Sequence, residues 1–183
     1  MVGYNPHMNQ TDRIVLPAAL PVLPVLHGAR LDLRAMQDGD AASLFDIYGD
    51  PLVMRYTDEP PFPGMETVAV MLDSVRRLLA QGLSLEWAIV LNGTGQVIGT
   101  CGLHSFDQAR REAEVGCLLR RSAWGGGYMA EALGLLMGFA GGVLRLQRLT
   151  ADVAPANGRA QRLFSKLGYR PDRTGLLAID LNK

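Results

Sequence analysis

The sequence lacks an excess of charge of either sign. Lys and Arg together number 18, Asp and Glu also number 18, and the formal net charge at neutral pH is therefore zero. A chain with this balance has no single-sign field with which to hold nucleic acid or an anionic membrane. We therefore expect neither nucleic acid nor a membrane among its partners.

Cysteine is also scarce. Cys101 and Cys117 are the only two, and no CxxC spacing occurs. They are too few for a disulfide framework and are typical of a protein in a reducing compartment, so we expect a cytoplasmic location. Cys101 and His104 form a CxxH pattern, but residues three apart on a strand face opposite sides, so we expect no metal site.

No apolar run is long enough to cross a membrane. The segment that comes nearest, Ile14–Leu26, contains three prolines, and each removes a backbone donor that a helix needs. Charges of opposite sign precede it and no small-residue cleavage site follows, so a signal peptide is not indicated. We expect residues 1–27 to form an irregular arm and residues 28–183 to form a single domain.

The sequence does contain enough apolar material for one core, since 48% of its 183 residues are hydrophobic. Segment 49–64, GDPLVMRYTDEPPFPG, is rich in Pro and Gly and predicts an irregular loop that borders a binding site. The Asn-Gly step at residues 92–93 predicts a hairpin and thus antiparallel strands. These patterns favour an α+β fold with a mixed, mostly antiparallel central sheet flanked by about four helices. We expect strands over residues 31–35, 85–91, 97–103, 111–119, 148–153 and 176–181, and helices over 39–48, 65–81, 128–139 and just after 157.

The segment with the most chemical content, LLRRSAWGGGYMAEALGLLMGF (residues 118–139), joins a strand to a helix. Its three consecutive glycines, Gly125–Gly127, have no Cβ, so their amides can approach a ligand closely. The helix that follows directs unpaired N–H groups and the positive end of its dipole at the same point, which predicts a pyrophosphate site. The alternative is a tight turn that needs glycine only for its backbone conformation.

Two other phosphate-binding motifs fit this segment less well. A nucleoside triphosphatase needs GxxxxGK[ST], and no lysine follows the glycines. GGGYMA does match the dinucleotide fingerprint GxGxxA, with Asp152 downstream to hold a ribose. A doubly wound sheet, however, needs several further βα units, and only roughly fifty residues remain after this motif.

A second motif, NGRAQRLFSKLGYR (residues 157–170), predicts a short amphipathic helix with Asn157 as its N-cap, because four apolar residues from Ala160 to Leu167 follow helical spacing. With this motif beside the glycine segment, the chain resembles the GNAT acyltransferase superfamily over residues 28–183. Within that superfamily it is similar to the Rim-type ribosomal protein N-acetyltransferase branch. The matching parts, in chain order, are RLDLRAM, GDPLVMRY, AEVGCLLRRSAWGGGYMAEAL and NGRAQRLFSKLGYR.

The resemblance implies that coenzyme A wedges into a sheet that is splayed at the cofactor site, after the strand that ends near Leu119. Asn157 would lie beside the cofactor arm or the acceptor. The main chain of three residues would pair with the pantetheine: Cys117, Leu118 and Leu119. The amides that would hold the pyrophosphate are those of Gly125, Gly126, Gly127, Tyr128, Met129 and Ala130.

The reaction that the resemblance implies is acetyl transfer from acetyl-CoA, as co-substrate, to a primary amine on a protein N-terminus or a small molecule. Glu114 is the candidate catalytic base, acting through water, because it lies on the strand that would flank the thioester. Glu112 on the same face and Glu86 on a neighbouring strand are further candidates. The alternative interpretation of Glu114 is an exposed structural carboxylate.

The chain departs from the family pattern where a general acid is expected. Phe164 stands where the superfamily commonly has Tyr, and Ala160 stands where the Rim branch has Ser. Neither side chain can donate a proton, so the alternative function is a catalytically weak or inactive acyl-CoA-binding module. As partners we expect acetyl-CoA and an amine acceptor, in a monomer or a homodimer.

Overall fold

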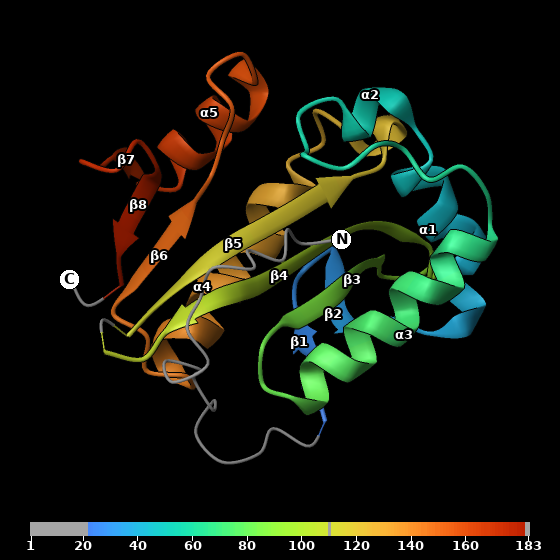
Figure 1. Ribbon diagram of the computed structural model, residues 1–183, viewed down its shortest axis with the longest axis horizontal. Helices are drawn as coiled ribbons and strands as arrows, with labels where there is room; N and C mark the ends of the chain where they lie inside the picture. The colour runs from blue at the N-terminus through green and yellow to red at the C-terminus, as the bar shows by residue number, and fades with distance from the viewer. Residues whose placement is uncertain (1–21, 110, 182–183) are drawn as a thin grey trace.

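A mixed sheet forms the centre of the computed structural model, which describes residues 22–109 and 111–181. Most of the expected N-terminal arm, residues 1–21, lies outside this description. The sheet has eight strands in the order β1-β2-β3-β4-β5-β6-β8-β7, and β5 with β6 is the one parallel pair among the described strands (Figure 1). The α+β class with a mostly antiparallel sheet is thus confirmed. The strands are β1 (Leu26–His27), β2 (Leu31–Ala35), β3 (Leu85–Leu91), β4 (Val97–Asp107), β5 (Glu112–Leu119), β6 (Arg148–Ala151), β7 (Arg170–Pro171) and β8 (Leu177–Asp180).

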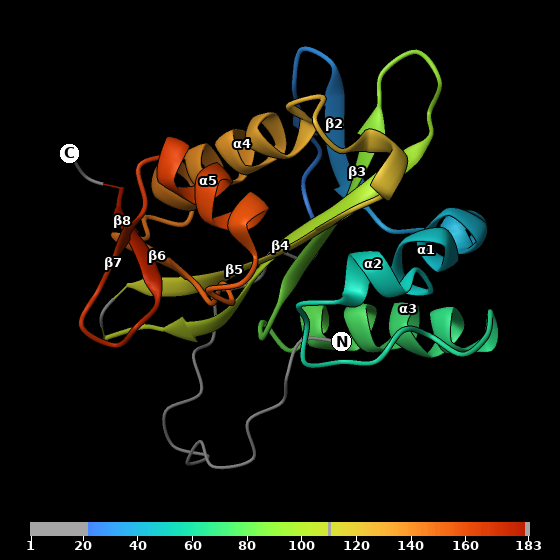
Figure 2. The same cartoon turned by 90° about the horizontal axis from the view of Figure 1, so that it is seen from above.

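The helices cover both faces of this sheet. As Figure 2 shows, α1, α2 and α3 lie on one face, and α4 and α5 lie on the other. None of the helices in the described part of the chain is long and apolar enough to cross a bilayer. The helices are α1 (Ala41–Tyr48), α2 (Pro51–Met54), α3 (Glu66–Ala80), α4 (Tyr128–Gly142) and α5 (Gly158–Lys166).

Alternation along the strands divides the core into two layers. On β3, Trp87 packs toward α4, where its ring meets Phe139 edge-on with 5.5 Å between the ring centroids. Its neighbour Ala88 belongs to the other layer, with Leu44 and Ile47 of α1. Successive strand residues point to opposite faces, so each central strand contributes to both layers.

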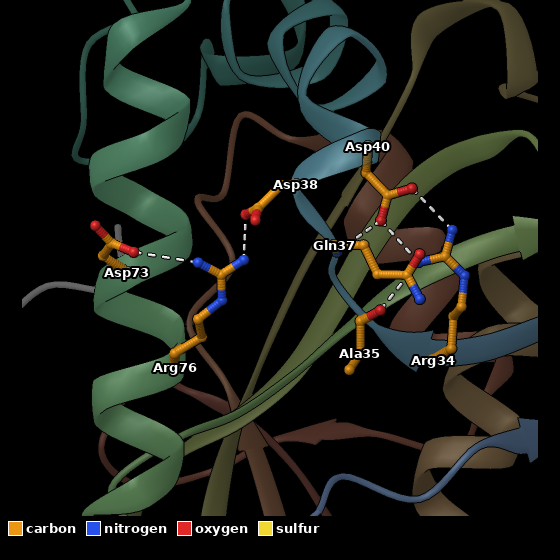
Figure 3. Close-up of polar contacts among 7 residues, drawn as sticks. All are labelled: Arg34, Ala35, Gln37, Asp38, Asp40, Asp73 and Arg76. Atoms are coloured by element: carbon orange, nitrogen blue, oxygen red, sulfur yellow. Dashed lines mark hydrogen bonds and ion pairs between the residues drawn. The ribbon is translucent and has the colours of Figure 1, made fainter.

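A half-buried ion pair joins β2 to the start of α1. The guanidinium of Arg34 donates to both carboxylate oxygens of Asp40, at 2.7 and 2.8 Å, and the backbone N–H of Gln37 donates to the same carboxylate at 2.8 Å. Burial alone would raise the pKa of Asp40, but these hydrogen bonds outweigh it and hold the pKa below its usual value. Figure 3 shows this pair beside a more exposed one, in which Arg76 of α3 contacts Asp38.

Where β5 meets β6, the sheet forks. The two strands pair only at three positions, from Glu112 to Glu114 on β5 and from Arg148 to Thr150 on β6. Beyond Glu114, β5 remains paired with β4 on one side, but no described strand pairs with its other edge. Residues 115–119 therefore present a row of backbone groups toward the gap.

Two local expectations were wrong. Segment 49–64 contains the four-residue helix α2, because Asp50 caps it by accepting from the N–H of Leu52 at 2.8 Å and Pro51 occupies the first turn, where proline is tolerated. Five α-helices are therefore present in the described residues, in line with the expectation of about four. Strand β4 continues past Leu103 to Asp107, because a bulge at Ser105 (φ 50°) lets the ladder resume opposite Glu112.

Candidate active site

The fork opens into the cleft that carries the expected site. The cleft has a volume of about 920 Å³ and lies between α2 with its following loop, the unpaired edge of β5, the turn into α4, and the N-terminus of α5. Nine of the ten residues expected to bind the cofactor line it: Cys117, Leu118, Leu119, Gly125, Gly127, Tyr128, Met129, Ala130 and Asn157. The end of β5 and Asn157, which are about forty residues apart in the chain, thus line the same cleft.

Gly126 is the tenth, and it is not part of the cleft lining. Its carbonyl accepts a hydrogen bond from Nη1 of Arg30 at 2.8 Å, which ties this residue to the start of β2. A Cβ at Gly126 would lie 2.7 Å from the ring of Tyr128, so any larger residue would disturb the turn for steric reasons alone.

Glycine is favoured at the positions on either side of Gly126. Gly125 and Gly127 have φ values of 81° and 75°, in the left-handed region that other residues rarely adopt. Gly127 is the N-cap of α4, so the first-turn N–H groups of the helix point toward the cleft from this position. The indole N–H of Trp124 donates to the carbonyl of Leu119 at 2.7 Å and closes the loop between β5 and the turn.

Arg30 holds this turn in place, a role that the sequence did not reveal. Its backbone N–H donates to Oε1 of Glu131 at 2.8 Å, its Nε donates to Oε2 at 2.7 Å, and its guanidinium lies 4.7 Å from the centroid of the Tyr128 ring. Together with the bond to Gly126, these contacts form what we call the Arg30 clamp. Arg30 opens the motif RLDLRAM and Glu131 lies in YMAEA, but their pairing across 101 positions leaves no local signal.

Glu114 lies at the point where β5 and β6 separate, beside Thr150 in the ladder, and it lines the cleft. Burial raises its pKa, the nearby carboxylate of Asp152 raises it further, and a hydrogen bond from the backbone N–H of Asp152 opposes both. Glu112, two residues earlier, is bound instead to Nε of Arg148 at 3.0 Å and does not line the cleft. The two glutamates of β5 are therefore not equivalent, and only Glu114 faces the site.

Glu86 and His104 also line the cleft, on the face of the sheet that carries α1. Burial raises the pKa of Glu86 to about 7, against a hydrogen bond from the hydroxyl of Ser84 at 2.9 Å. Burial lowers the pKa of His104 to about 4, so its ring is neutral at physiological pH. Cys101 packs in the core on the opposite face from His104, as the spacing predicted. Within residues 22–109 and 111–181, no group of three or more His, Cys, Asp or Glu side chains is placed to hold a metal ion.

The helix α5 forms as expected behind Asn157, whose side-chain oxygen accepts from the N–H of Ala160 at 3.2 Å. Ala160 and Phe164 both line the cleft. The ring of Phe164 is 2% exposed and meets the ring of Tyr169 edge-on, with 4.9 Å between centroids. Burial raises the pKa of Tyr169, which packs in the core. The side of the cleft formed by this helix thus offers no hydroxyl at either family position.

Comparison with known proteins gives a consistent result. The profile of the acetyltransferase (GNAT) domain matches residues 30–170. An uncharacterized N-acetyltransferase called p20, from Bacillus licheniformis, is 33% identical over 155 residues, which cover 85% of this chain and 86% of that protein.

Two solved structures share the fold. Spermidine N-acetyltransferase from Vibrio cholerae, in complex with CoA and spermine, has a TM-score of 0.74 at 17% identity, covering 84% of this chain and 97% of that one. RimJ from Mycobacterium smegmatis, in complex with CoA-disulfide, has a TM-score of 0.73 at 22% identity, covering 86% of this chain and 88% of that one.

Proposed function

Because the chain belongs to the GNAT family of acetyltransferases, we propose that it moves the acetyl group of acetyl-CoA to a primary amine by direct attack on the thioester. The observation that carries this proposal is the fork itself. One unpaired strand edge, residues 115–119, leads from a cleft carboxylate at Glu114 to the N-terminus of α4.

The residues present fit coenzyme A. A pantetheine arm carries amides that can extend a strand ladder as a peptide does, and the free edge at Cys117–Leu119 offers such a ladder. The first-turn N–H groups of α4 would hold the pyrophosphate, since a helix N-terminus favours negative charge. A Cβ built on Gly125 would meet no atom within 4 Å, so the turn leaves open space on that side. When bound, acetyl-CoA supplies the activated acetyl group.

The chain must then supply a free amine. A lysine-like amine, with a pKa of about 10.4, needs roughly 4 to 5 kcal/mol to lose its proton at neutral pH, whereas an α-amine near 8 needs about 1.4 kcal/mol. Glu114 is the base we propose, because its raised pKa makes it a better proton acceptor than an ordinary glutamate. It takes the proton through water, and the amine then forms a C–N bond as the C–S bond breaks. The departing thiolate, with a thiol pKa of about 8.5, takes its proton from solvent.

An acyl-CoA-binding module with little or no turnover is the second candidate, and the specific observation that favours it is the absence of a hydroxyl at Ala160 and Phe164. The two functions share the cofactor site and differ only in chemistry. Release of free CoA thiol therefore distinguishes them.

The deciding experiment combines calorimetry with a thiol-release assay. We expect acetyl-CoA to bind, and CoA to be released above the spontaneous rate with at least one of four acceptor classes: N-terminal peptides, polyamines, aminoglycosides and free amino acids. Binding without release would establish the binding module instead. No binding of acetyl-CoA or CoA would refute both.

A matched pair of variants tests the cofactor site. Gly125→Asp places a carboxylate beside the proposed pyrophosphate, and Gly125→Asn is a control with the same backbone demand and no charge, since Asn and Asp both tolerate a positive φ. We expect the Asp variant to bind CoA at least about tenfold more weakly than the Asn variant, because like charges repel in a confined site. Equal affinities would show that the pyrophosphate lies elsewhere.

A further inference from the structure

The cleft contains, besides Glu114, a partly buried carboxylate on β3 that the proposed acetyl-transfer chemistry does not use. Glu86 lies on β3, two strands from the proposed position of the thioester, and is partly exposed to the cleft. Among the described residues, its side chain accepts a hydrogen bond from the hydroxyl of Ser84. In the part of the chain that the structure describes, no Arg, Lys or His side chain forms an ion pair with it. Glu86 therefore has no cationic side-chain partner among the described residues.

Two glycines make room for this carboxylate and keep the floor beside it open. The strand register places Glu86, Gly102 and Gly116 side by side across β3, β4 and β5. A Cβ at Gly102 would overlap the Glu86 carboxylate, so the side chain lies over this glycine. Gly116 adds no side chain between Glu86 and the free edge of β5. The result is a strip of sheet without Cβ atoms at Gly102 and Gly116, in which the Glu86 carboxylate lies over Gly102 and the ring of His104 lies beside Gly116.

The distances suit one small substrate. Neighbouring strands lie about 4.8 Å apart, so the backbones of β3 and β5 are roughly 10 Å apart at this level. This separation leaves room for one small amine between a side chain on β3 and a side chain on β5. Glu114 is two residues from Gly116 on the same face of β5. A molecule in the cleft between Glu86 and Glu114 would therefore reach both carboxylates.

Three described groups beside Glu86 are uncharged at neutral pH. Tyr48 faces it from α1, and the hydroxyl of Tyr48 is bound to the hydroxyl of Thr100 at 2.9 Å. The thiols of Cys101 and Cys117, on β4 and β5, have raised pKa values, that of Cys117 to about 12, chiefly through burial. His104 beside Gly116 is neutral. The described arginines Arg55, Arg159 and Arg162 line the same cleft, but none of them forms an ion pair with Glu86. A cationic ligand beside this carboxylate would be attracted to it, and burial strengthens that attraction because water screens it less.

We propose that Glu86 is the subsite for the charged ammonium group of the acceptor, which enters protonated and lies against the Glu86 carboxylate on the side that faces the cleft. This inference rests on the proposed function. It assigns a substrate class, a cationic primary amine, and makes Glu86 a specificity-determining residue distinct from the base at Glu114. Neutral nucleophiles of the same size would lack the attraction.

Nuclear magnetic resonance of the Glu side-chain carboxyl, in the CoA-saturated protein, tests binding without any turnover. The probes are n-butylamine and the amide of Ala-Ala-Ala, and the uncharged controls are n-butanol and the N-acetylated peptide amide. We expect Glu86 to titrate near pH 7 and the amines to lower its midpoint by about one unit or more, which corresponds to tenfold tighter binding to the carboxylate form. The controls should leave the midpoint unchanged. If neither amine moves it, the inference is wrong.

Variants supply the second arm. Glu86→Gln keeps the shape and the Ser84 contact, and we expect KM for the amine to rise at least about tenfold while kcat changes less and the Kd of acetyl-CoA stays within about twofold. Gly102→Ala should have the same effect by displacing the carboxylate. Asp58→Asn removes an exposed acid from the same cleft and should change KM less than about threefold, because solvent screens it.

A fall in kcat with unchanged KM in Glu86→Gln would place the residue in the chemical step and overturn the subsite. Failure of the proposed function looks different. In that case the amines still move the Glu86 midpoint, but acetyl-CoA does not bind or no thiol is released.

Discussion

Replacement of Arg30 by Met removes the guanidinium of the Arg30 clamp and keeps an aliphatic stem. The lost contacts are a hydrogen bond to a carbonyl, worth about 1 kcal/mol, an ion pair worth up to about 1 kcal/mol, and a cation–π contact worth about 0.5 kcal/mol. Arg30 is 49% exposed and Glu131 is 19% exposed, so the ion pair belongs at the lower end of its range. We expect the free energy of unfolding to fall by about 1 to 2 kcal/mol, measured by urea denaturation.

The same substitution should weaken the cofactor site. Without the contact to Gly126, the glycine turn samples other conformations, and affinity falls in proportion to the population that remains competent to bind. A competent population of one third to one tenth predicts a Kd for CoA that is about three- to tenfold higher by calorimetry, with kcat nearly unchanged. Arg121→Met removes the same charge from an exposed site near the turn and is the control, for which we expect less than a twofold change.

The pH dependence provides a further check on this reasoning. The backbone N–H and guanidinium of Arg30 hold the pKa of Glu131 below its usual value. Their contribution to stability is therefore present above the unfolded pKa of about 4.3 and is lost as pH falls through the lower folded value. Arg30→Met should reduce this acid-dependent loss. Unchanged CoA affinity in a destabilised variant would mean that the clamp stabilises the fold and does not organise the turn.

Two further predictions concern carboxylates. Asp40→Asn leaves the half-buried Arg34 without its charge partner and should lower the free energy of unfolding by about 2 kcal/mol at neutral pH, as measured in urea. Because the folded pKa of Asp40 is depressed, this difference between wild type and variant should be full above about pH 4 and shrink as pH falls below it, and a difference that persists at low pH would contradict the assignment. Glu114→Gln should depress kcat/KM most below the pKa of the acceptor amine and recover partly as pH rises, in a profile from about pH 6 to pH 9.5. A constant ratio to wild type over that range would make Glu114 a structural carboxylate.

Local chemistry in the sequence was enough for the parts of the site that are continuous in the chain. Short motifs describe three of these parts: the cap at Asn157, the apolar spacing along α5, and the glycines before α4. Each depends on residues that are close together in the chain. The resemblance to the GNAT family added the order of these parts and is confirmed by the match over residues 30–170. The roles of the individual site residues remain predictions.

The contacts that the sequence did not reveal are those between distant segments or those in which a familiar signal has two meanings. The clamp pairs Arg30 with Glu131, and the seat of Glu86 depends on Gly102 in the next strand. Neither arrangement produces a periodic pattern in the sequence. Arg30 has the appearance of an ordinary surface charge, and Gly102 has that of an isolated glycine. Pro51 illustrates the second case, because proline breaks a helix interior but also begins helices, and only the cap at Asp50 decides between them.

The short ladder between β5 and β6 affects how the molecule opens. Strands β1 to β4 pair in chain order, each with the next strand along the chain. Strand β6, by contrast, pairs with β5 at only three residue positions, in parallel, and is separated from it in the chain by α4. Such weakly joined units open locally, so amides in β6, β8 and α5 should exchange with deuterium well before those in β3 and β4. A ligand seated in the fork touches both sides and acts as a staple between them. Its binding should therefore slow amide exchange in the C-terminal strands more than in the rest of the sheet. The bound ligand would then supply contacts between β5 and the C-terminal strands that the described part of the chain does not itself make.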